Sequence, residues 1–383
     1  METAEEKFIA IVKRAMDLHA YSKQISSVCP MLPEHVHIEP TNACNLRCIH
    51  CHQSSRGQAF TKKLGVMPLA LFTKIIDEIR HYAARITLDL QGEPLLHPEI
   101  TAMISCAKAA GLSVSLLTNA TRLTRELADR LIEIKLDRIV FSFEGSTAEI
   151  HERVRRGSNY HATLRNILYF LKRNAETGRG TFVCMSMVAS AAAAGDADAY
   201  TEYFSRLPVN TIFVNPLLSM SGGTPTSGEV DLSRYSGLKP EEIPICRLPW
   251  EAPAINCDGT VSACAVDFNA AHIVGDVNDT PLATIWNSPA MQAFRQCHID
   301  RNFASIEAKG PLCTHCNCRF AEEYDLRETR EFIARYVMRQ AKVFAPLFLA
   351  AAAPEPERTA DEPLALVRRE YERVLGICPH EVE

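Results

Sequence analysis

The chain has 383 residues, of which 47% are hydrophobic and 23% are charged, and its formal net charge is −5. This length exceeds the usual size of one domain, so we expect one large domain and a smaller one. The weakly acidic charge gives no basic surface for nucleic acid or an anionic membrane, and no apolar run reaches the roughly 18 residues that span a bilayer. Because the N-terminus also lacks a signal-peptide pattern, we expect a cytoplasmic protein with no membrane or nucleic-acid partner.

Short β-rich segments alternate with helical patterns from residue 35 onward. The segments between the expected strands carry apolar residues at helical spacing. This alternation predicts an α/β fold with parallel strands and right-handed crossovers, either as an open sheet or as a partial barrel. Ligands in such folds bind at the carboxyl ends of the strands. The expected strands are 35–40, 86–92, 113–119, 138–145, 181–189 and 211–217.

Composition divides the chain into five parts. A predicted N-terminal helical segment, 1–34, precedes the strand–helix region of 35–217. Residues 218–245 are rich in Gly, Ser, Pro and Thr, which predicts a linker or lid. Residues 246–320 hold a second group of cysteines and form the predicted smaller domain. Helices are expected in the remaining segment, 321–383.

The chain contains 14 cysteines, a high number for a cytosolic protein, where clustered cysteines more often bind metals than form disulfides. Cys44, Cys48 and Cys51 follow the first predicted strand in a C-x3-C-x2-C array. Structural zinc takes four ligands, usually as C-x2-C pairs. Three thiolates at this spacing instead suit a [4Fe–4S] cluster with one iron left open for another ligand.

The segment CNLRCIHC resembles the cluster motif of the radical S-adenosylmethionine (SAM) superfamily. The resemblance implies a partial (β/α)6 TIM-like barrel in which SAM binds the open iron of the [4Fe–4S] cluster. It implies reductive cleavage of SAM to methionine and a 5′-deoxyadenosyl radical, which abstracts a hydrogen atom from the substrate. It also implies an electron donor protein of the flavodoxin or ferredoxin type.

Polar residues near the ends of the next three predicted strands are similar to SAM-binding positions of this superfamily. The resemblance implies that the Gly-Glu-Pro motif receives the SAM amino group, because glycine permits close backbone approach and a carboxylate accepts from an ammonium. It implies that a serine and an acidic residue lie near the ribose and that an arginine, with Arg153 as the alternative, pairs with the SAM carboxylate. The SAM-binding candidates are Gly92, Glu93, Pro94, Asn119, Ser142, Glu144 and Arg155.

A second cysteine set follows the predicted linker. Cys246 and Cys264 are separated by 17 residues, and Cys313 and Cys316 form a C-x2-C pair. Four thiolates suit either zinc or a [4Fe–4S] cluster. The spacing C-x12-G-x4-C before the pair resembles the SPASM/twitch extension of radical SAM enzymes, which implies an auxiliary [4Fe–4S] cluster.

The sequence departs from the full SPASM pattern after Cys316. That pattern continues with further cysteines, but position 322 is Glu and only Cys318 follows closely. We therefore expect one auxiliary cluster of the twitch type rather than two. Cys257 and Cys318 are the possible substitute ligands.

Three hypotheses for function follow. A cluster with four protein ligands suits electron transfer, which favours a radical SAM oxidoreductase of the dehydrogenase type that acts on a small hydroxylated molecule, similar to an aminocyclitol or sugar, in natural-product biosynthesis. The second hypothesis is a maturase that crosslinks or epimerises a ribosomally made precursor peptide, with Cys257 as a hydrogen donor. The third is a non-catalytic module in which both cysteine sets hold structural zinc.

Overall fold

The computed structural model describes residues 26–178, 180–219, 226–230, 245–246, 248–310, 312–314 and 316. Most of the predicted N-terminal helical segment and linker, the predicted C-terminal helices and Cys318 lie outside the described residues. The described strands form one nine-stranded sheet in the order β6-β5-β4-β3-β2-β1-β7-β8-β9.

Six parallel strands make up the larger part of this sheet, and each pairs with the next in the chain. All six coincide with the segments predicted from the sequence. The second ends at Leu88, earlier than predicted, because Leu90 has a φ of 73° and so leaves the extended conformation. The strands are β1 (His35–Ile38), β2 (Arg85–Leu88), β3 (Ser113–Thr118), β4 (Arg138–Ser142), β5 (Phe182–Ala189) and β6 (Thr211–Pro216).

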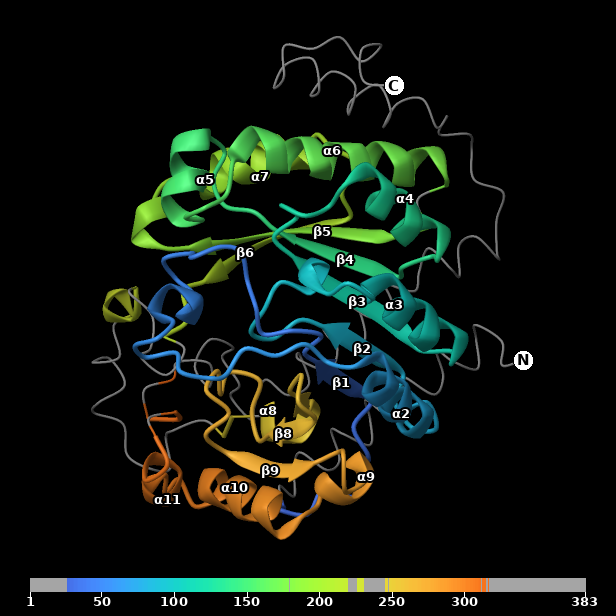
Figure 1. Ribbon diagram of the computed structural model, residues 1–383. Helices are drawn as coiled ribbons and strands as arrows, with labels where there is room; N and C mark the ends of the chain where they lie inside the picture. The colour runs from blue at the N-terminus through green and yellow to red at the C-terminus, as the bar shows by residue number, and fades with distance from the viewer. Residues whose placement is uncertain are drawn as a thin grey trace, which may run out of the picture.

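Helices connect these strands and cover one face of them (Figure 1). The α-helices are α2 (Leu69–Ile79), α3 (Ile100–Ala109), α4 (Arg125–Glu133), α5 (Ala148–Val154), α6 (Tyr160–Glu176) and α7 (Ala197–Ser205). The 3-10 helices are η1 (His52–Ser55), η2 (Pro94–Leu96), η3 (Ala191–Ala193) and η5 (Ser227–Glu229). Threonine or asparagine side chains accept from backbone amides at the starts of α4, α5 and α6, which stabilises these helix ends.

The core lies between the strands and these helices. In β1, Val36 and Ile38 are fully buried in the core, and the alternating residues His35 and His37 point to the opposite face. The same alternation places Met185 of β5 in the core. The face that is not covered by α2 to α7 is therefore available for a site.

The smaller C-terminal part extends the same sheet. β7 pairs in parallel with β1, and β8 and β9 follow in antiparallel order. Within the described residues β6 pairs only with β5, so the six parallel strands form a partial barrel. No described helix combines the length and apolar character needed to cross a bilayer. The elements are α8 (Leu248–Glu251), β7 (Ala254–Ile255), β8 (Thr260–Ser262), β9 (Ile273–Asp276), α9 (Leu282–Ile285), α10 (Pro289–Ile299) and α11 (Ala304–Glu307).

Candidate active site and second cysteine centre

The first cysteine motif lies on the loop between β1 and η1. Two backbone hydrogen bonds clamp this loop to the end of α5 and the segment that follows it, from Arg47 N to Arg156 O at 2.9 Å and from Ile49 N to Val154 O at 3.0 Å. The loop therefore holds its conformation through the protein's own backbone. Its three cysteines are Cys44, Cys48 and Cys51.

The three thiols of this loop lie within electrostatic reach of one another. Burial, together with the charge of a neighbouring thiol, raises the pKa of Cys48 to about 12 and that of Cys51 to about 11, although Arg155 acts to lower both. Burial also raises the pKa of Cys44. Three thiolates can form together here only when a cation compensates them, so the donor set fits a thiolate-bound iron cluster.

Gly92 follows β2 where the chain crosses the segment before the cysteines. A Cβ atom here would lie 1.9 Å from Thr41 O and 2.8 Å from Ala43 O, so no side chain fits. Glu93 N then donates to Ala43 O at 2.8 Å, and Pro94 begins η2. The sequence predicts close backbone approach at this glycine, and in the structure the approaching group is the protein's own backbone.

The Glu93 carboxylate holds the ends of β2 and β3 together. It accepts from Thr118 Oγ1 at 2.6 Å, Asn119 N at 2.7 Å and Leu95 N at 3.0 Å. Burial raises the pKa of Glu93, although these hydrogen bonds act in the opposite direction. This network gives Glu93 a positioning role, and its contact with the SAM amino group stays a prediction.

Asn119 connects the end of β3 to the cysteine loop. Its Nδ2 lies 3.8 Å from Cys44 Sγ and donates to Asn45 Oδ1 at 3.2 Å. Its Oδ1 accepts from Thr121 N at 3.0 Å, and the intervening Ala120 has a left-handed φ of 58°. The structure thus brings this predicted residue to the first cysteine.

Arg155 and Glu144 form a buried ion pair beside the second cysteine. The guanidinium contacts both carboxylate oxygens, with Nη2 3.0 Å from Oε1, and its Nη1 lies 3.7 Å from Cys48 Sγ. Burial opposes both charges, but Arg155 lowers the pKa of Glu144 and Glu144 raises the pKa of Arg155. The pair therefore stays ionised and supplies a fixed positive charge next to the Cys48 thiol.

The alternative arginine lies at the surface. The Arg153 side chain is 50% exposed, pairs with Glu149 at 3.3 Å and donates to Ala192 O at 2.6 Å. Ser142, the last residue of β4, is half-buried. Of the two candidate arginines, the structure brings Arg155 to the cysteine loop.

The face of the sheet opposite the helices is polar. His37 Nδ1 lies 2.9 and 3.0 Å from the two carboxylate oxygens of Asp89, and His35 Nε2 lies 2.7 Å from Thr87 Oγ1. Burial lowers the pKa of His35 well below its ordinary value. Burial also acts to lower the pKa of His37, but Asp89 overrides it and raises this pKa. Sequence analysis did not single out these histidines, although their alternation with Val36 in β1 was the available signal.

The second cysteine set lines a single cavity, as the sequence predicts. The lining combines four thiols with apolar side chains and one histidine: Cys246, Leu248, Pro249, Cys264, Val266, Phe294, His298, Leu312, Cys313 and Cys316. Burial raises the pKa of Cys264 well above its ordinary value, and the charges of the other three thiols raise it further. A buried set of thiols again fits a cationic centre.

The four thiols of this cavity match the ligand number of a structural zinc site and that of a [4Fe–4S] cluster.

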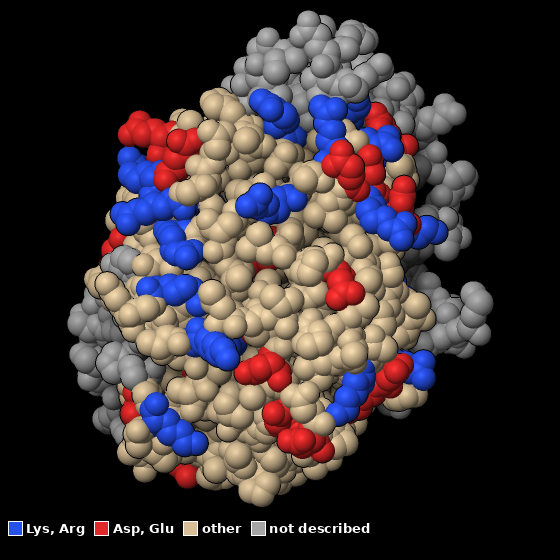
Figure 2. Space-filling view, viewed as in Figure 1, with Lys and Arg blue, Asp and Glu red and all other residues tan. Residues whose placement is uncertain are grey.

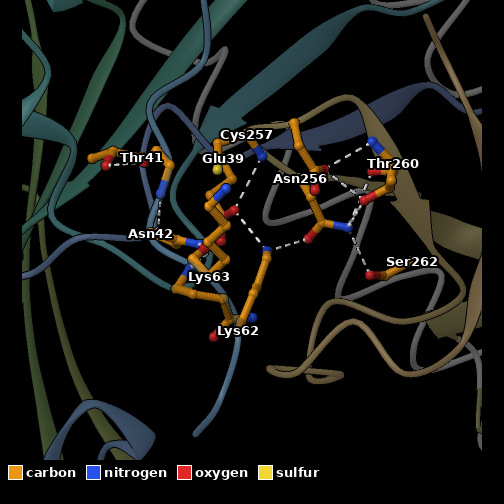
Figure 3. A network of polar contacts seen from close by, with 12 residues as sticks. Glu39, Thr41, Asn42, Lys62, Lys63, Asn256, Cys257, Thr260 and Ser262 are labelled. Carbon is orange, nitrogen blue, oxygen red and sulfur yellow. Dashed lines mark hydrogen bonds and ion pairs between the residues drawn. The ribbon is translucent and has the colours of Figure 1, made fainter. Parts of the chain in front are cut away.

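Cys257 lies apart from this cavity, in the network of Figure 3. Glu39 Oε2 accepts from Lys62 Nζ at 2.8 Å and from Cys257 N at 3.1 Å, and Lys62 Nζ also donates to Asn256 Oδ1 at 2.7 Å. The Cys257 thiol is 3% exposed and packs against Gly65. This placement does not support Cys257 as a substitute ligand, and its burial weighs against a role as hydrogen donor.

The segments beside the two cysteine sets touch each other. Gln53 Nε2, two residues after Cys51, donates to Gln91 O, and Gln91 Nε2 donates to Ala265 O at 3.2 Å, next to Cys264. The rings of His52 and Phe268 stack in parallel with centroids 5.1 Å apart. The two predicted metal centres therefore lie beside one shared boundary. Sequence analysis missed Gln53 and Gln91, whose proximity to the two motifs was the only signal.

Two family models match the chain. The model of the radical SAM superfamily matches residues 38–188, which include the first cysteine motif and most of the parallel strands. The SPASM model, an iron–sulfur cluster-binding domain, matches residues 246–317, which include the second set. The chain is thus a radical SAM enzyme with a C-terminal SPASM/twitch domain.

The curated relatives of the chain have diverse names. The tungsten-containing aldehyde ferredoxin oxidoreductase cofactor-modifying protein of Pyrococcus furiosus is 24% identical over 329 residues, which cover 76% of this chain and 89% of that protein. The AdoMet-dependent heme synthase of Methanosarcina barkeri is 33% identical over 117 residues, 30% of this chain and 33% of that protein. The second match spans only about a third of its relative's length.

A solved structure supports the fold. SuiB of Streptococcus suis, bound to its precursor peptide SuiA, superposes with a TM-score of 0.57 at 15% identity, covering 76% of this chain and 70% of SuiB. At this identity the likeness concerns the fold alone. It confirms the predicted class, a partial α/β barrel with a smaller C-terminal domain.

The family matches also confirm the cofactors predicted from the sequence. They are SAM, the [4Fe–4S] cluster that binds SAM, and an auxiliary [4Fe–4S] cluster. At both cysteine sets the thiols are buried and close enough to raise one another's pKa, which fits ligands of a cationic cluster.

Proposed function

We propose that the chain is a SAM-dependent radical oxidoreductase that oxidises a small hydroxylated molecule, of the cyclitol or sugar type, in natural-product biosynthesis. Cys44, Cys48 and Cys51 would hold the cluster that binds SAM. The auxiliary cluster would be held by the four thiols that line the second cavity, Cys246, Cys264, Cys313 and Cys316. When bound, the first centre supplies a 5′-deoxyadenosyl radical from SAM and one electron, and the second supplies an acceptor for one electron.

The contact between the two cysteine segments carries this proposal. Gln91 belongs to the turn that leads into the Gly-Glu-Pro motif, and its side chain reaches the backbone beside Cys264. His52 and Phe268 add a second contact between the same segments. A centre that only stabilised the fold would not need this proximity, whereas one that receives an electron from the substrate radical would.

The polar inner face of the sheet supports a small polar substrate. His37 is held by Asp89 through Nδ1, an arrangement that fixes the ring and leaves Nε2 to act as proton acceptor. Oxidation of an alcohol to a ketone removes one hydrogen atom, which would go to the 5′-deoxyadenosyl radical, one electron, which would go to the auxiliary cluster, and one proton, which needs a base. We propose His37 as that base.

The proposal also includes an acidic electron donor of the flavodoxin or ferredoxin type and a cytoplasmic setting, where thiols stay reduced. Arg47 and Arg156 are exposed on the clamped cysteine loop and on the segment that clamps it. Figure 2 shows Lys and Arg side chains along the side of the molecule where α5 and η1 lie. Positive charge at this rim would steer an acidic donor toward the first centre.

Anaerobic reconstitution with iron and sulfide tests the proposal. We expect two clusters per chain by iron analysis and formation of 5′-deoxyadenosine from SAM in the presence of dithionite. A panel of cyclitols and amino sugars deuterated at each carbinol carbon should include a substrate that transfers deuterium into 5′-deoxyadenosine. One equivalent of ketone should appear for each turnover.

Two sets of variants separate the centres. Cys44→Ala, Cys48→Ala and Cys51→Ala should abolish 5′-deoxyadenosine formation. Cys313→Ala with Cys316→Ala should preserve SAM cleavage without ketone formation. Ketone formation by this double variant at the original rate would refute the proposed role of the auxiliary cluster.

A further inference from the structure

One polar side chain contacts a thiol of the second cavity. His298 Nε2 lies 3.6 Å from Cys313 Sγ, within the range of a hydrogen bond to sulfur. The other non-cysteine side chains that line this cavity are apolar: Leu248, Pro249, Val266, Phe294 and Leu312. A histidine in such a setting provides a directed N–H dipole where little else is polar.

The fold fixes the orientation of this ring. His298 lies in the last turn of α10, one helical turn after Phe294, so both side chains face the cavity. Its ring is 3% exposed and makes ring contacts with Phe294 at 5.3 Å, Phe303 at 5.1 Å and Trp250 at 6.2 Å between centroids. The aromatic contacts on several sides leave the ring little freedom to turn away from Cys313.

We propose that His298 donates a hydrogen bond from Nε2 to the Cys313 thiolate and thereby raises the reduction potential of the auxiliary cluster. This inference rests on the proposed function, because it requires that cluster. Hydrogen bonds to the ligating sulfurs stabilise the more negatively charged, reduced state, and their effect is strongest in a dry site. His298 is a positioning and tuning residue, since it acts on the substrate only through the cluster.

The consequence would be a better electron acceptor. An auxiliary cluster at a higher potential takes one electron from the substrate radical more readily, and the radical loses one proton in the same step. The histidine would therefore bias the enzyme toward oxidation of the radical over return of the hydrogen atom from 5′-deoxyadenosine.

The test uses the full chain with Cys44, Cys48 and Cys51 all changed to Ala, so that only the auxiliary cluster is present. Its midpoint potential is measured by redox titration followed by EPR. We expect His298→Phe, which keeps an aromatic ring but has no donor, to shift the potential to more negative values. His298→Gln, which keeps an N–H donor, should shift it less.

His272→Gln is the matched control. His272 is also a buried histidine of this domain and contacts Phe294, but it bonds Ile306 O and does not line the cavity. His272→Gln should leave the midpoint potential of the auxiliary cluster unchanged. Equal potentials for His298→Phe and the parent, or equal shifts in the His272 variant, would overturn the inference.

If His298→Phe loses its cluster, the hydrogen bond can still be tested in the parent protein, which has an intact His298. Pulsed EPR of the reduced cluster with 15N-labelled histidine should show a weak nitrogen coupling that disappears in His298→Gln. No coupling, or the strong coupling of a direct ligand, would contradict the hydrogen bond. A parent without any auxiliary cluster would refute the proposed function itself, which separates the two failures.

Discussion

The ion pair between Arg155 and Glu144 should stabilise the folded barrel as well as serve its chemistry. Changing Glu144 to Gln keeps the size of the side chain and removes its charge. The Arg155 guanidinium then stays buried next to Cys48 without a counter-charge, because its side chain is only 8% exposed. We expect a large loss of stability from this conservative change.

The magnitude follows from the burial of both partners. Removing one member of a buried ion pair costs about 3–5 kcal/mol, because the remaining charge stays desolvated. Since Gln retains one acceptor oxygen for the guanidinium, we expect the lower end, about 3 kcal/mol, or about a hundredfold in the unfolding equilibrium constant. Changing Glu144 to Leu together with Arg155 to Met should recover most of this loss, because no charge is left unpaired.

Urea unfolding followed by circular dichroism measures these differences. Fluorescence is less suitable, since both tryptophans, Trp250 and Trp286, lie in the C-terminal domain. Glu149→Gln is the control, because it breaks an exposed pair with Arg153 and should cost at most about 1 kcal/mol. Equal losses for Glu144→Gln and Glu149→Gln would refute the reasoning.

Three further predictions concern the same region. Gly92→Ala should prevent formation of the first cluster, because its Cβ would overlap a backbone oxygen, and iron analysis should show only the auxiliary cluster. NMR titration should give His37 a pKa above its ordinary value of 6.5, because Asp89 raises this pKa more than burial and Arg85 lower it. The protonated ring therefore stabilises the folded state below pH 6.5, and this stabilisation is lost as the pH rises through the folded-state pKa. Asp89→Asn should abolish both the raised pKa and this stabilisation. Gln91→Leu should retain both clusters and SAM cleavage but form several-fold less ketone for each 5′-deoxyadenosine, as quantified by mass spectrometry.

The parallel strands could be predicted well from the sequence because two signals indicate most of them. Each of β1 to β5 is a short run of β-rich residues that precedes an α-helix with an apolar face. Strand ends were less predictable. The early end of β2 depends on the left-handed backbone of Leu90, a residue type that gives no warning of this conformation.

Site residues could be predicted from the sequence only where their spacing along the chain forms a recognisable motif. The first set of cysteines stands at short intervals and the second at a recognisable spacing, and the structure brings the second set to one cavity. The contact between Gln91 and Ala265 joins residues 174 positions apart, and the bond from Lys62 to Asn256 joins residues 194 apart. No local pattern encodes such contacts, because they depend on the pairing of β7 with β1.

The polypeptide itself sets the distance between the two centres. The contacts between the domains include an edge pairing of strands, a stacked ring pair and the buried Glu39–Lys62–Asn256 network, and none of these involves a ligand thiol. Lys62 is only 8% exposed and Glu39 is not exposed, so separating the domains would leave two charges to be rehydrated or re-paired. A hinge at this boundary would therefore be costly. Electron transfer between substrate and auxiliary cluster should accordingly depend on fixed geometry and on the tuning of the cluster, which is where His298 acts.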